Sequence, residues 1–460
     1  MVREYPVAQS AATPIASNAT RRHHGRVETS SSGARPLSVQ DKSFPPSAHG
    51  RTREQFLATE PALSDFATPL LTLDAGAMVH NVARMAGWAQ EAGVLLAPHG
   101  KTTMAPALWR QLLDDRPLGA GAWGLTLATP WQAQVARAHG VRRILIANEV
   151  VDPIGLRWIA DELAAHQDVE LLSWADGVDV VRAMEAALSG GAPRPLRVLV
   201  ELGGAGGRTG ARDRATARAI ADAIAASPVL ELAGVGGYEG ALAHDAGDAA
   251  IARVDAYLAD LADLHRELAD AGLYPEGLRP VVTAGGSAYF DRVGAVLPPL
   301  CPDADVVVRS GAFQIHDDGF YAGISPMGRT IGDAPFRSAM HVWARVLSRP
   351  EPGLALLDCG RRDASFDEGL PIAQRIAGRA DEEDVLAGSH VSALNDQHLF
   401  LRLGDEAVAS GAAARLQVGD VVRLGLSHPC TALDKWRLIP VVADADAPDP
   451  VVVDAVETVF

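Results

Sequence analysis

One lysine in the chain stands where a reactive amine is expected. Lys101 lies in the sequence PHGKTT (residues 98–103), between a short apolar run and an Ala-rich segment of helical period. If the apolar run is a barrel strand, the lysine lies at the strand's carboxyl end, which is the active-site face of such barrels. A desolvated lysine loses its proton easily and becomes a nucleophile that can form an imine. Most lysines are surface residues, so both interpretations stay open at this point.

Two glycine-containing turns offer a site for a phosphate group. They are TAGGS (residues 283–287) and RSG (residues 309–311), each at the end of a strand-like run. Glycine turns expose backbone N–H groups to an anion, and barrels commonly bind phosphate in the loops after strands seven and eight. The simpler interpretation is two tight turns that need glycine for positive φ. A phosphate site beside an imine-forming lysine is what pyridoxal phosphate requires.

A third glycine-rich segment, GGAGGRTG (residues 203–210), follows another strand-like run. A dinucleotide-binding fingerprint that begins at Gly204 and Gly206 needs a further glycine where this chain has Thr209. The indication of a dinucleotide site is therefore weak. Arg208 is the more informative residue, because it brings a permanent positive charge to the mouth of the predicted barrel.

His428 and Cys430 form a candidate metal pair in the sequence SHPC (residues 427–430). Residues two apart on an extended strand point the same way, so the two side chains can share one ion. Imidazole and thiolate together favour zinc. By spacing alone the indication is weak, because a histidine and a small cysteine often lie close together by chance.

The elements that would position these residues follow an alternating strand–helix pattern. Eight runs are predicted to be strands: residues 95–98, 122–127, 143–147, 170–174, 196–202, 232–238, 280–284 and 305–309. Helical patterns lie between them, and Thr129 and Asp152 are candidate caps that precede Pro130 and Pro153. An open doubly wound sheet also alternates in this way. Eight units in a row favour an α/β fold of the closed (β/α)8 type.

The rest of the chain reads differently. After about Gly323 the helical period fades, and short apolar runs between Gly, Pro and Asp predict a mostly β domain. We therefore expect a tail at residues 1–53, a barrel at residues 69–323 and a β domain at residues 324–460. The run at residues 69–73 precedes the first helix and can pair with the β domain. The tail is rich in Ser, Ala, Arg, His and Pro and lacks periodicity.

Composition excludes several classes of partner. The 41 basic and 57 acidic residues leave a net charge of −16, which argues against nucleic acid and anionic membranes. No apolar run approaches the roughly 20 residues of a membrane span. Three cysteines, Cys301, Cys359 and Cys430, are too few for a disulfide framework. A reducing, cytoplasmic setting is the expectation.

Taken together, these residues resemble the fold-type III pyridoxal-phosphate proteins related to alanine racemase. The chain is most similar to the branch that holds D-serine dehydratase, D-threonine aldolase and the bacterial amino acid deaminases. The resemblance extends from about Thr68 into the C-terminal region. Its most specific segments are PHGKTTMAP (98–106), VELGGAGGRTG (200–210), RSGAFQIHDD (309–318), LNDQH (394–398) and SHPCTALDKW (427–436).

The resemblance implies a role for each candidate residue. Lys101 would form the imine, Arg208 would lie beside the pyridine nitrogen, and Tyr238 would line the pocket. The phosphate would be held by five residues of the two turns: Gly285, Gly286, Ser287, Ser310 and Gly311. His428 and Cys430 would bind the divalent metal, which their chemistry favours as Zn²⁺. A homodimer is implied as well, with the stretch from Asp358 to Gly369 as the candidate contact.

The chain departs from the family pattern at one position. Phe313 stands where relatives often carry a tyrosine, so a hydroxyl at that place is absent or comes from elsewhere, with Tyr321 as the candidate. An arginine beside the ring nitrogen cannot give up its proton, so the ring would be a weaker electron sink. A metal on the substrate's 3-hydroxyl would compensate as a Lewis acid, and Lys101 would act as the base.

Three functions therefore remain open. The first is a dehydratase that converts a small D-3-hydroxy amino acid of the D-serine type into a 2-oxo acid and ammonia. The second is a metal-assisted aldolase of the D-threonine type. The third is a pyridoxal-phosphate-binding protein without strong catalysis, and the β domain with its metal pair distinguishes the first two from it.

Overall fold

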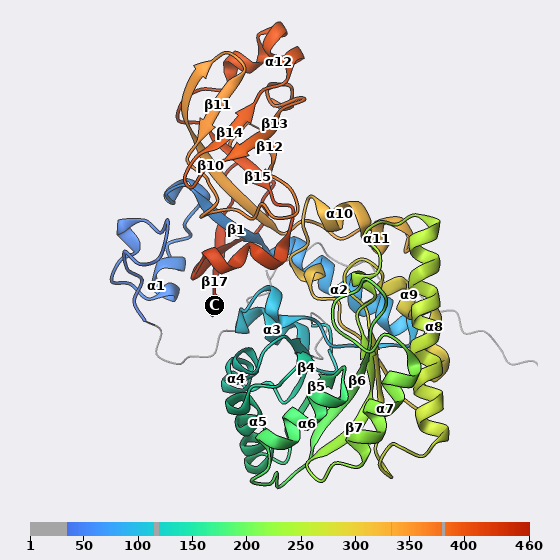
Figure 1. The fold of residues 1–460 in the computed structure, drawn as a ribbon. Helices are drawn as coiled ribbons and strands as arrows, with labels where there is room; N and C mark the ends of the chain where they lie inside the picture. Colours follow the sequence, from blue (N-terminus) through green and yellow to red (C-terminus); the bar gives the residue numbers. More distant parts are fainter. Residues whose placement is uncertain (1–34, 115–118, 333, 380–381) are drawn as a thin grey trace, which may run out of the picture.

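The computed structural model describes residues 35–114, 119–332, 334–379 and 382–460. Figure 1 shows a barrel surrounded by helices, drawn from cyan to yellow, and a sheet-rich domain in orange and red at one end of it. Each domain has its own buried apolar core. The predicted combination of an α/β barrel with a mostly β domain is confirmed.

Eight parallel strands form the barrel in the order β2-β9-β8-β7-β6-β5-β4-β3. They are β2 (Leu95–Leu96), β3 (Leu125–Leu127), β4 (Arg143–Glu149), β5 (Glu170–Ala175), β6 (Leu196–Leu202), β7 (Leu230–Gly237), β8 (Val281–Ala284) and β9 (Asp305–Val308). The ring closes where Trp123 N–H donates to Leu96 O at 2.7 Å and Thr126 N–H donates to Pro98 O at 2.9 Å. Closure rules out the open doubly wound sheet.

Helices follow the strands and cover the outside of the barrel (Figure 1). They are α2 (Ala75–Ala92), α3 (Pro106–Leu113), α4 (Pro130–Ala138), α5 (Pro153–Ala165), α6 (Val178–Ala187), α7 (Arg214–Ala225), α8 (Asp248–Asp270) and α9 (Phe290–Val296). Thr129 and Asp152 cap α4 and α5 by accepting the N–H of the third residue of each helix. Within the described ranges, no helix combines the length and the apolar composition needed to cross a bilayer.

The second domain is built on a nine-stranded sheet. Its strands are β1 (Leu70–Asp74), β10 (Met340–Glu351), β11 (Leu354–Leu357), β12 (Ile372–Ile376), β13 (His390–Leu394), β14 (Leu399–Arg402), β15 (Val421–Gly425), β16 (Leu438–Val442) and β17 (Val452–Glu457). β1 runs antiparallel to β10 and parallel to β16. The early run at residues 69–73 therefore lies in this sheet, before the chain enters the barrel.

Two contacts tie the domains together beside the barrel mouth. The Asp74 carboxylate accepts hydrogen bonds from Ala77 N–H, at the start of α2, and from Ala445 N–H in the β domain, both at 2.7 Å. Near the other end of the chain, Val459 N–H donates to Met104 O at 2.7 Å. Met104 follows the Lys101 segment, so the β domain holds the backbone next to that lysine.

The tail predicted for residues 1–53 is wrong in its second part. Residues 1–34 lie outside the described residues, but from Arg35 onward the chain packs on the β domain. It forms a short helix, α1 (Arg53–Leu57), with an apolar cluster around Phe44, Phe56 and Phe66. The ring centroids of these three phenylalanines lie 5.2–6.0 Å apart. Such pairs bury large apolar areas at favourable ring geometry, which holds the segment in place.

Phe56→Ala is expected to lower the free energy of unfolding by about 3–5 kcal/mol, because it leaves a cavity in this cluster. Urea denaturation followed by tryptophan fluorescence measures the change. The matched control is Val39→Ala in the same segment, where the side chain is 83% exposed and the expected effect is within about 0.5 kcal/mol. An unchanged midpoint for Phe56→Ala would show that the segment contributes nothing to folding.

Candidate active site

Lys101 lies at the mouth of the barrel. It occupies a short 3-10 helix, Gly100–Thr102, after β2, and its side chain is half-buried. Gly100 makes this turn possible, because a Cβ there would lie 2.8 Å from the Leu125 side chain and 2.9 Å from Trp109 Nε1. The Trp109 indole also donates to Gly100 O at 3.0 Å. The close packing around Gly100 therefore fixes the direction in which the next residue, Lys101, leaves the chain.

The chain contains only three lysines, Lys42, Lys101 and Lys435. Lys42 pairs with the buried carboxylate of Asp363. Lys435 donates to Thr431 O at 2.7 Å and so holds the short turn that it belongs to. Lys101 is therefore the lysine that the barrel offers for a covalent link to a cofactor.

The electrostatic surroundings of Lys101 bring the predicted residues together. Burial lowers the pKa of Lys101; the charge of Cys430 opposes this shift, and Arg208 and Arg309 add to it. The pKa of the buried His99 ring is well below its ordinary value, through burial first and then through the charges of Lys101, Arg309 and Arg208. These groups thus share one neighbourhood, and a lowered pKa gives Lys101 more of the neutral, nucleophilic form.

Arg208 is positioned by the loop that follows β6. The guanidinium of Arg212 donates to backbone carbonyls of residues 207–210 and so holds the glycine-rich loop in one shape. Arg208 itself is exposed, and its Cζ lies 5.1 Å from the centroid of the Tyr238 ring. The two residues that sequence analysis placed at the ends of β6 and β7 are therefore neighbours.

Arg309 has a larger part in the site than the sequence indicated. It is 1% exposed, its Cζ lies 4.9 Å from the centroid of the Trp174 ring, and it donates to Thr283 Oγ1 at 2.7 Å and to Gly237 O. This one side chain contacts the carboxyl ends of β5, β7 and β8. Its sequence signal was an arginine directly after the apolar run of β9.

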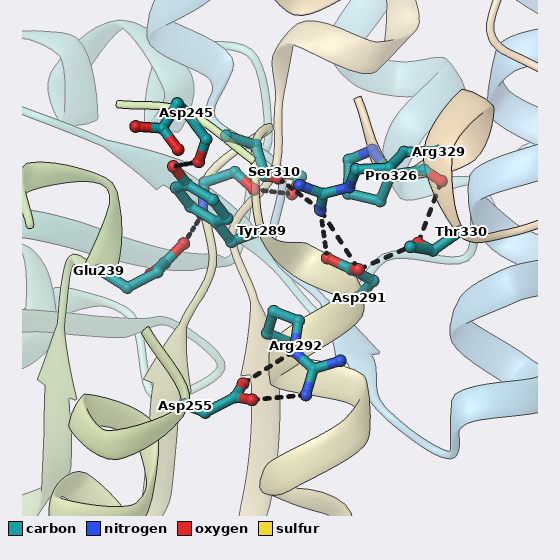
Figure 2. Close-up of polar contacts among 12 residues, drawn as sticks. Glu239, Asp245, Asp255, Tyr289, Asp291, Arg292, Ser310, Pro326, Arg329 and Thr330 are labelled. Atoms are coloured by element: carbon teal, nitrogen blue, oxygen red, sulfur yellow. Dashed lines mark hydrogen bonds and ion pairs between the residues drawn. The ribbon is translucent and has the colours of Figure 1, made fainter. Parts of the chain in front are cut away.

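Figure 2 shows how the loop after β8 is held. The Glu239 carboxylate accepts hydrogen bonds from Gly285 N–H at 2.9 Å and Gly286 N–H at 2.7 Å. Ser310 Oγ donates to Gly286 O at 2.8 Å and joins this loop to the one after β9. Gly285 has a φ of +100°, so the turn also needs glycine for its shape. Glu239 takes both N–H groups in this structure, so the phosphate contact of Gly285 and Gly286 stays a prediction.

The remaining N–H groups of the two loops fit a phosphate. Among the described residues, no acceptor faces the backbone N–H of Ser287, Ser310 or Gly311. At Gly311 a Cβ would lie 2.6 Å from His99 N, so this loop packs directly against the Lys101 segment. Free N–H donors next to a half-buried lysine are groups that could hold pyridoxal phosphate, and the attachment at Lys101 stays a prediction.

His428 and Cys430 meet at the barrel mouth, though not on a strand. His428 is extended and follows β15, whereas Cys430 lies in a 3-10 helix, Pro429–Thr431. Burial lowers the pKa of His428, but hydrogen bonds and charges from Cys430 and Asp367 outweigh burial and raise it to about 9. Cys430 Sγ lies 3.7 Å from Thr102 Oγ1, next to Lys101. The predicted strand geometry is wrong, yet the two ligand groups are adjacent and their nitrogen and sulfur donors fit zinc.

Aromatic hydroxyls border the same region. Burial raises the pKa of Tyr238 to about 12, so this residue keeps its proton. Phe313 is 2% exposed and stacks on Phe336 with centroids 6.0 Å apart, so it belongs to the core. The Tyr321 ring lies 6.1 Å from the His428 ring, and burial with the charge of Cys430 raises its pKa. The Tyr321 ring therefore lies beside His428, and its role as a source of the hydroxyl stays a prediction.

Sequence analysis missed a carboxylate cluster at the ends of β4, β5 and β6. One oxygen each from Glu149, Asp176 and Glu201 lie within 4.8 Å of one another. Burial and the neighbouring Glu149 raise the pKa of Glu201 to about 8, so Glu201 keeps a proton at neutral pH. Thr209 Oγ1 donates to Glu201 at 3.1 Å, and Gly210 N–H donates to Asp176 at 3.2 Å. These carboxyl groups hold the end of the loop that carries Arg208.

Several known proteins are similar to this chain in sequence. A family model described as "Putative serine dehydratase domain" matches residues 339–442. The 3-hydroxy-D-aspartate aldolase of Paracoccus denitrificans (strain Pd 1222) is 27% identical over 347 residues, which cover 75% of this chain and 84% of the relative. The D-threo-3-hydroxyaspartate dehydratase of Delftia sp. (strain HT23) is 27% identical over 380 residues, which cover 79% of this chain and 90% of the relative.

A solved structure extends the likeness to most of the chain. The crystal structure of D-threonine aldolase from Filomicrobium marinum superposes with a TM-score of 0.70 at 26% identity. It covers 86% of this chain and 96% of that protein. Barrel, β domain and their order therefore agree with those of the aldolase.

Proposed function

The chain belongs to the fold-type III pyridoxal-phosphate family, and we propose that it is a metal-dependent dehydratase of small D-3-hydroxy amino acids of the D-serine type. One observation carries this proposal. Cys430 Sγ lies 3.7 Å from Thr102 Oγ1, so the His428–Cys430 pair adjoins the segment that holds Lys101. This proximity supports a reaction in which Lys101 acts on the Cα end of the substrate and a metal held by His428 and Cys430 acts on the Cβ end.

The residues of the site divide the work between them. Pyridoxal phosphate, when bound, acidifies the α-proton of an amino acid attached to it. Burial lowers the pKa of Lys101 and so favours the neutral amine, the form that can accept that proton as general base. Arg208 is permanently charged and gives no proton to the ring nitrogen.

The metal pair would act on the β-carbon. A zinc ion held by His428 and Cys430 would supply a Lewis acid for the substrate's 3-hydroxyl, which then leaves as hydroxide or water. Among the described residues His428 and Cys430 are the two ligands proposed here, so water and substrate oxygens would complete the coordination, as in catalytic rather than structural zinc sites. Loss of the α-proton and of the hydroxyl gives, after hydrolysis, a 2-oxo acid and ammonia.

A D-threonine-type aldolase is the second candidate. Two of the relatives described above are named aldolases, and the same metal pair would assist removal of the hydroxyl proton instead of the hydroxyl group. The Cα–Cβ bond then breaks, and glycine and an aldehyde form. The choice between the two reactions depends on which proton of the substrate is removed first.

The products identify the reaction directly. We expect the protein, loaded with pyridoxal phosphate and zinc, to convert D-serine into pyruvate and ammonia, and to act on D-threo-3-hydroxyaspartate in the same manner. Formation of glycine and acetaldehyde from D-threonine as the main reaction would show the aldolase instead. L-serine and L-threonine serve as stereochemical controls. Absence of turnover with all three D-substrates would contradict both proposals and leave a binding protein.

A further inference from the structure

Asp367 makes a close contact with the proposed metal pair. Its Oδ2 lies 2.7 Å from Nδ1 of His428, and its Oδ1 accepts a hydrogen bond from Thr431 Oγ1 at 2.7 Å. Each carboxylate oxygen therefore has its own partner, and the two partners, His428 and Thr431, lie on either side of Cys430 in the sequence. Asp367 precedes His428 by 61 positions, which is why the sequence spacing does not reveal it.

The loop that carries Asp367 is anchored to the metal segment at a second place. It connects β11 to β12, and Ser427 Oγ donates to the backbone oxygen of Glu368 at 2.5 Å. Gly369 has a φ of +130°, and a Cβ there would lie 2.7 Å from Ser427 Oγ. The loop therefore approaches Ser427 so closely that a side chain at residue 369 would not fit. This packing brings Asp367 to His428 in a fixed position.

We propose that Asp367 is the positioning residue of the metal site and makes Nε2 the ligand atom of His428; the inference rests on the metal-dependent function proposed above. An ionised carboxylate only accepts hydrogen bonds, so Nδ1 carries the proton and Nε2 keeps its lone pair for the metal. The same contact fixes the plane of the ring and raises the basicity of the imidazole. Partners of this kind typically change metal affinity by about 10–100-fold.

Asp367 is not placed as a third ligand. Both of its oxygens accept hydrogen bonds from His428 and Thr431. In the described part of the chain, the only group of three His, Cys, Asp or Glu side chains with ligand atoms within 4.8 Å is Glu149, Asp176 and Glu201. Asp367 would thus support the ion through His428 and would not be a ligand itself.

Zinc affinity of the pyridoxal-phosphate-loaded protein tests the proposal. Zinc is titrated against a chromogenic chelator for wild type, Asp367→Ala, Asp367→Asn and Thr431→Val. We expect a dissociation constant about 10–100-fold higher for Asp367→Ala. Asp367→Asn should lie between it and wild type, because the amide oxygen still accepts from Nδ1–H but carries no charge. The control is Asp434→Asn, whose carboxylate contacts Lys435 and should leave zinc binding unchanged.

Each outcome separates this proposal from the function it rests on. If wild type binds no zinc, the metal-dependent function fails and the role of Asp367 fails with it. If wild type binds zinc and Asp367→Ala binds it equally well, only the role of Asp367 is overturned. Melting temperature and cofactor absorbance of each variant report folding. Should Asp367→Ala unfold, Asp367→Asn and Thr431→Val decide, and wild-type affinity in both would overturn the inference.

Discussion

Lys101→Ala is expected to remove the visible absorbance of the lysine-bound cofactor and to lower turnover by at least about 10²–10⁴-fold, the range that a general base alone contributes. The variant loses both the covalent attachment and the base that takes the α-proton. The half-buried position of Lys101 and its lowered pKa support its proposed role as the reactive amine. Absorbance spectra and product assays on the purified variant measure both effects.

The small number of lysines makes this test unusually decisive. Borohydride reduction of the wild-type holoenzyme should label one peptide, the one that contains Lys101. The chain offers only two other lysines, Lys42 and Lys435. Lys435→Ala is the matched control, because it removes a lysine from the β domain without touching the barrel. It should keep the absorbance. Label on Lys42 or Lys435, or full absorbance in Lys101→Ala, would contradict the assignment.

Removal of the metal is expected to stop dehydration while the cofactor stays bound. The attachment at Lys101 and the free N–H groups of Ser310 and Gly311 belong to the barrel, whereas the metal pair belongs to the β domain. A chelator should therefore lower activity by more than about 10²-fold, in line with several kcal/mol of Lewis-acid stabilisation, and leave the absorbance unchanged. Added zinc should restore activity. Full dehydratase activity in a metal-free preparation would contradict the proposed mechanism.

Variants of Cys430 test whether the loss of activity on metal removal arises at the His428–Cys430 site. Cys430→Ala should reproduce the chelated enzyme and should not recover with zinc at concentrations that saturate wild type. Cys430→Asp replaces a soft ligand by a hard one, so its metal preference should shift toward ions such as Mn²⁺ or Mg²⁺. Cys301→Ala is the control, since Cys301 is also a half-buried free cysteine but its Sγ contacts Gly93 O on the barrel. Metal content and activity of the three variants are the measurements.

Local patterns were sufficient for the barrel and for Lys101. Apolar runs that alternate with helical patterns predicted all eight barrel strands, because the residues of each strand are apolar and lie in the buried core. Caps such as Thr129 and Asp152 act within four residues of the helix they start, so they too can be read from sequence. Lys101 follows from these elements, since the carboxyl ends of parallel barrel strands meet at one face. The predicted homodimer and cytoplasmic location stay predictions.

Contacts between residues far apart in the sequence were not predicted, because they form only when folding brings distant segments together. Phe44 lies within residues 1–53, which were predicted to be a tail, and its packing with Phe56 and Phe66 on the β domain orders the described part of that segment. Asp367 and His428 are 61 positions apart in the sequence, and no local sequence pattern in the loop of Asp367 predicts their contact.

The phosphate loops show the same division between sequence and tertiary structure. By itself the sequence determined the barrel and the place of Lys101 at the end of a barrel strand, and it predicted the chemical types of the metal ligands, because these depend on local periodicity and on side-chain chemistry. Glu239, from the end of β7, takes the N–H groups of Gly285 and Gly286, although glycine turns alone predicted an anion site there. Which donors remain free and which carboxylate orients His428 were decided only by the tertiary structure, since a hydrogen bond depends on where two chain segments meet in space.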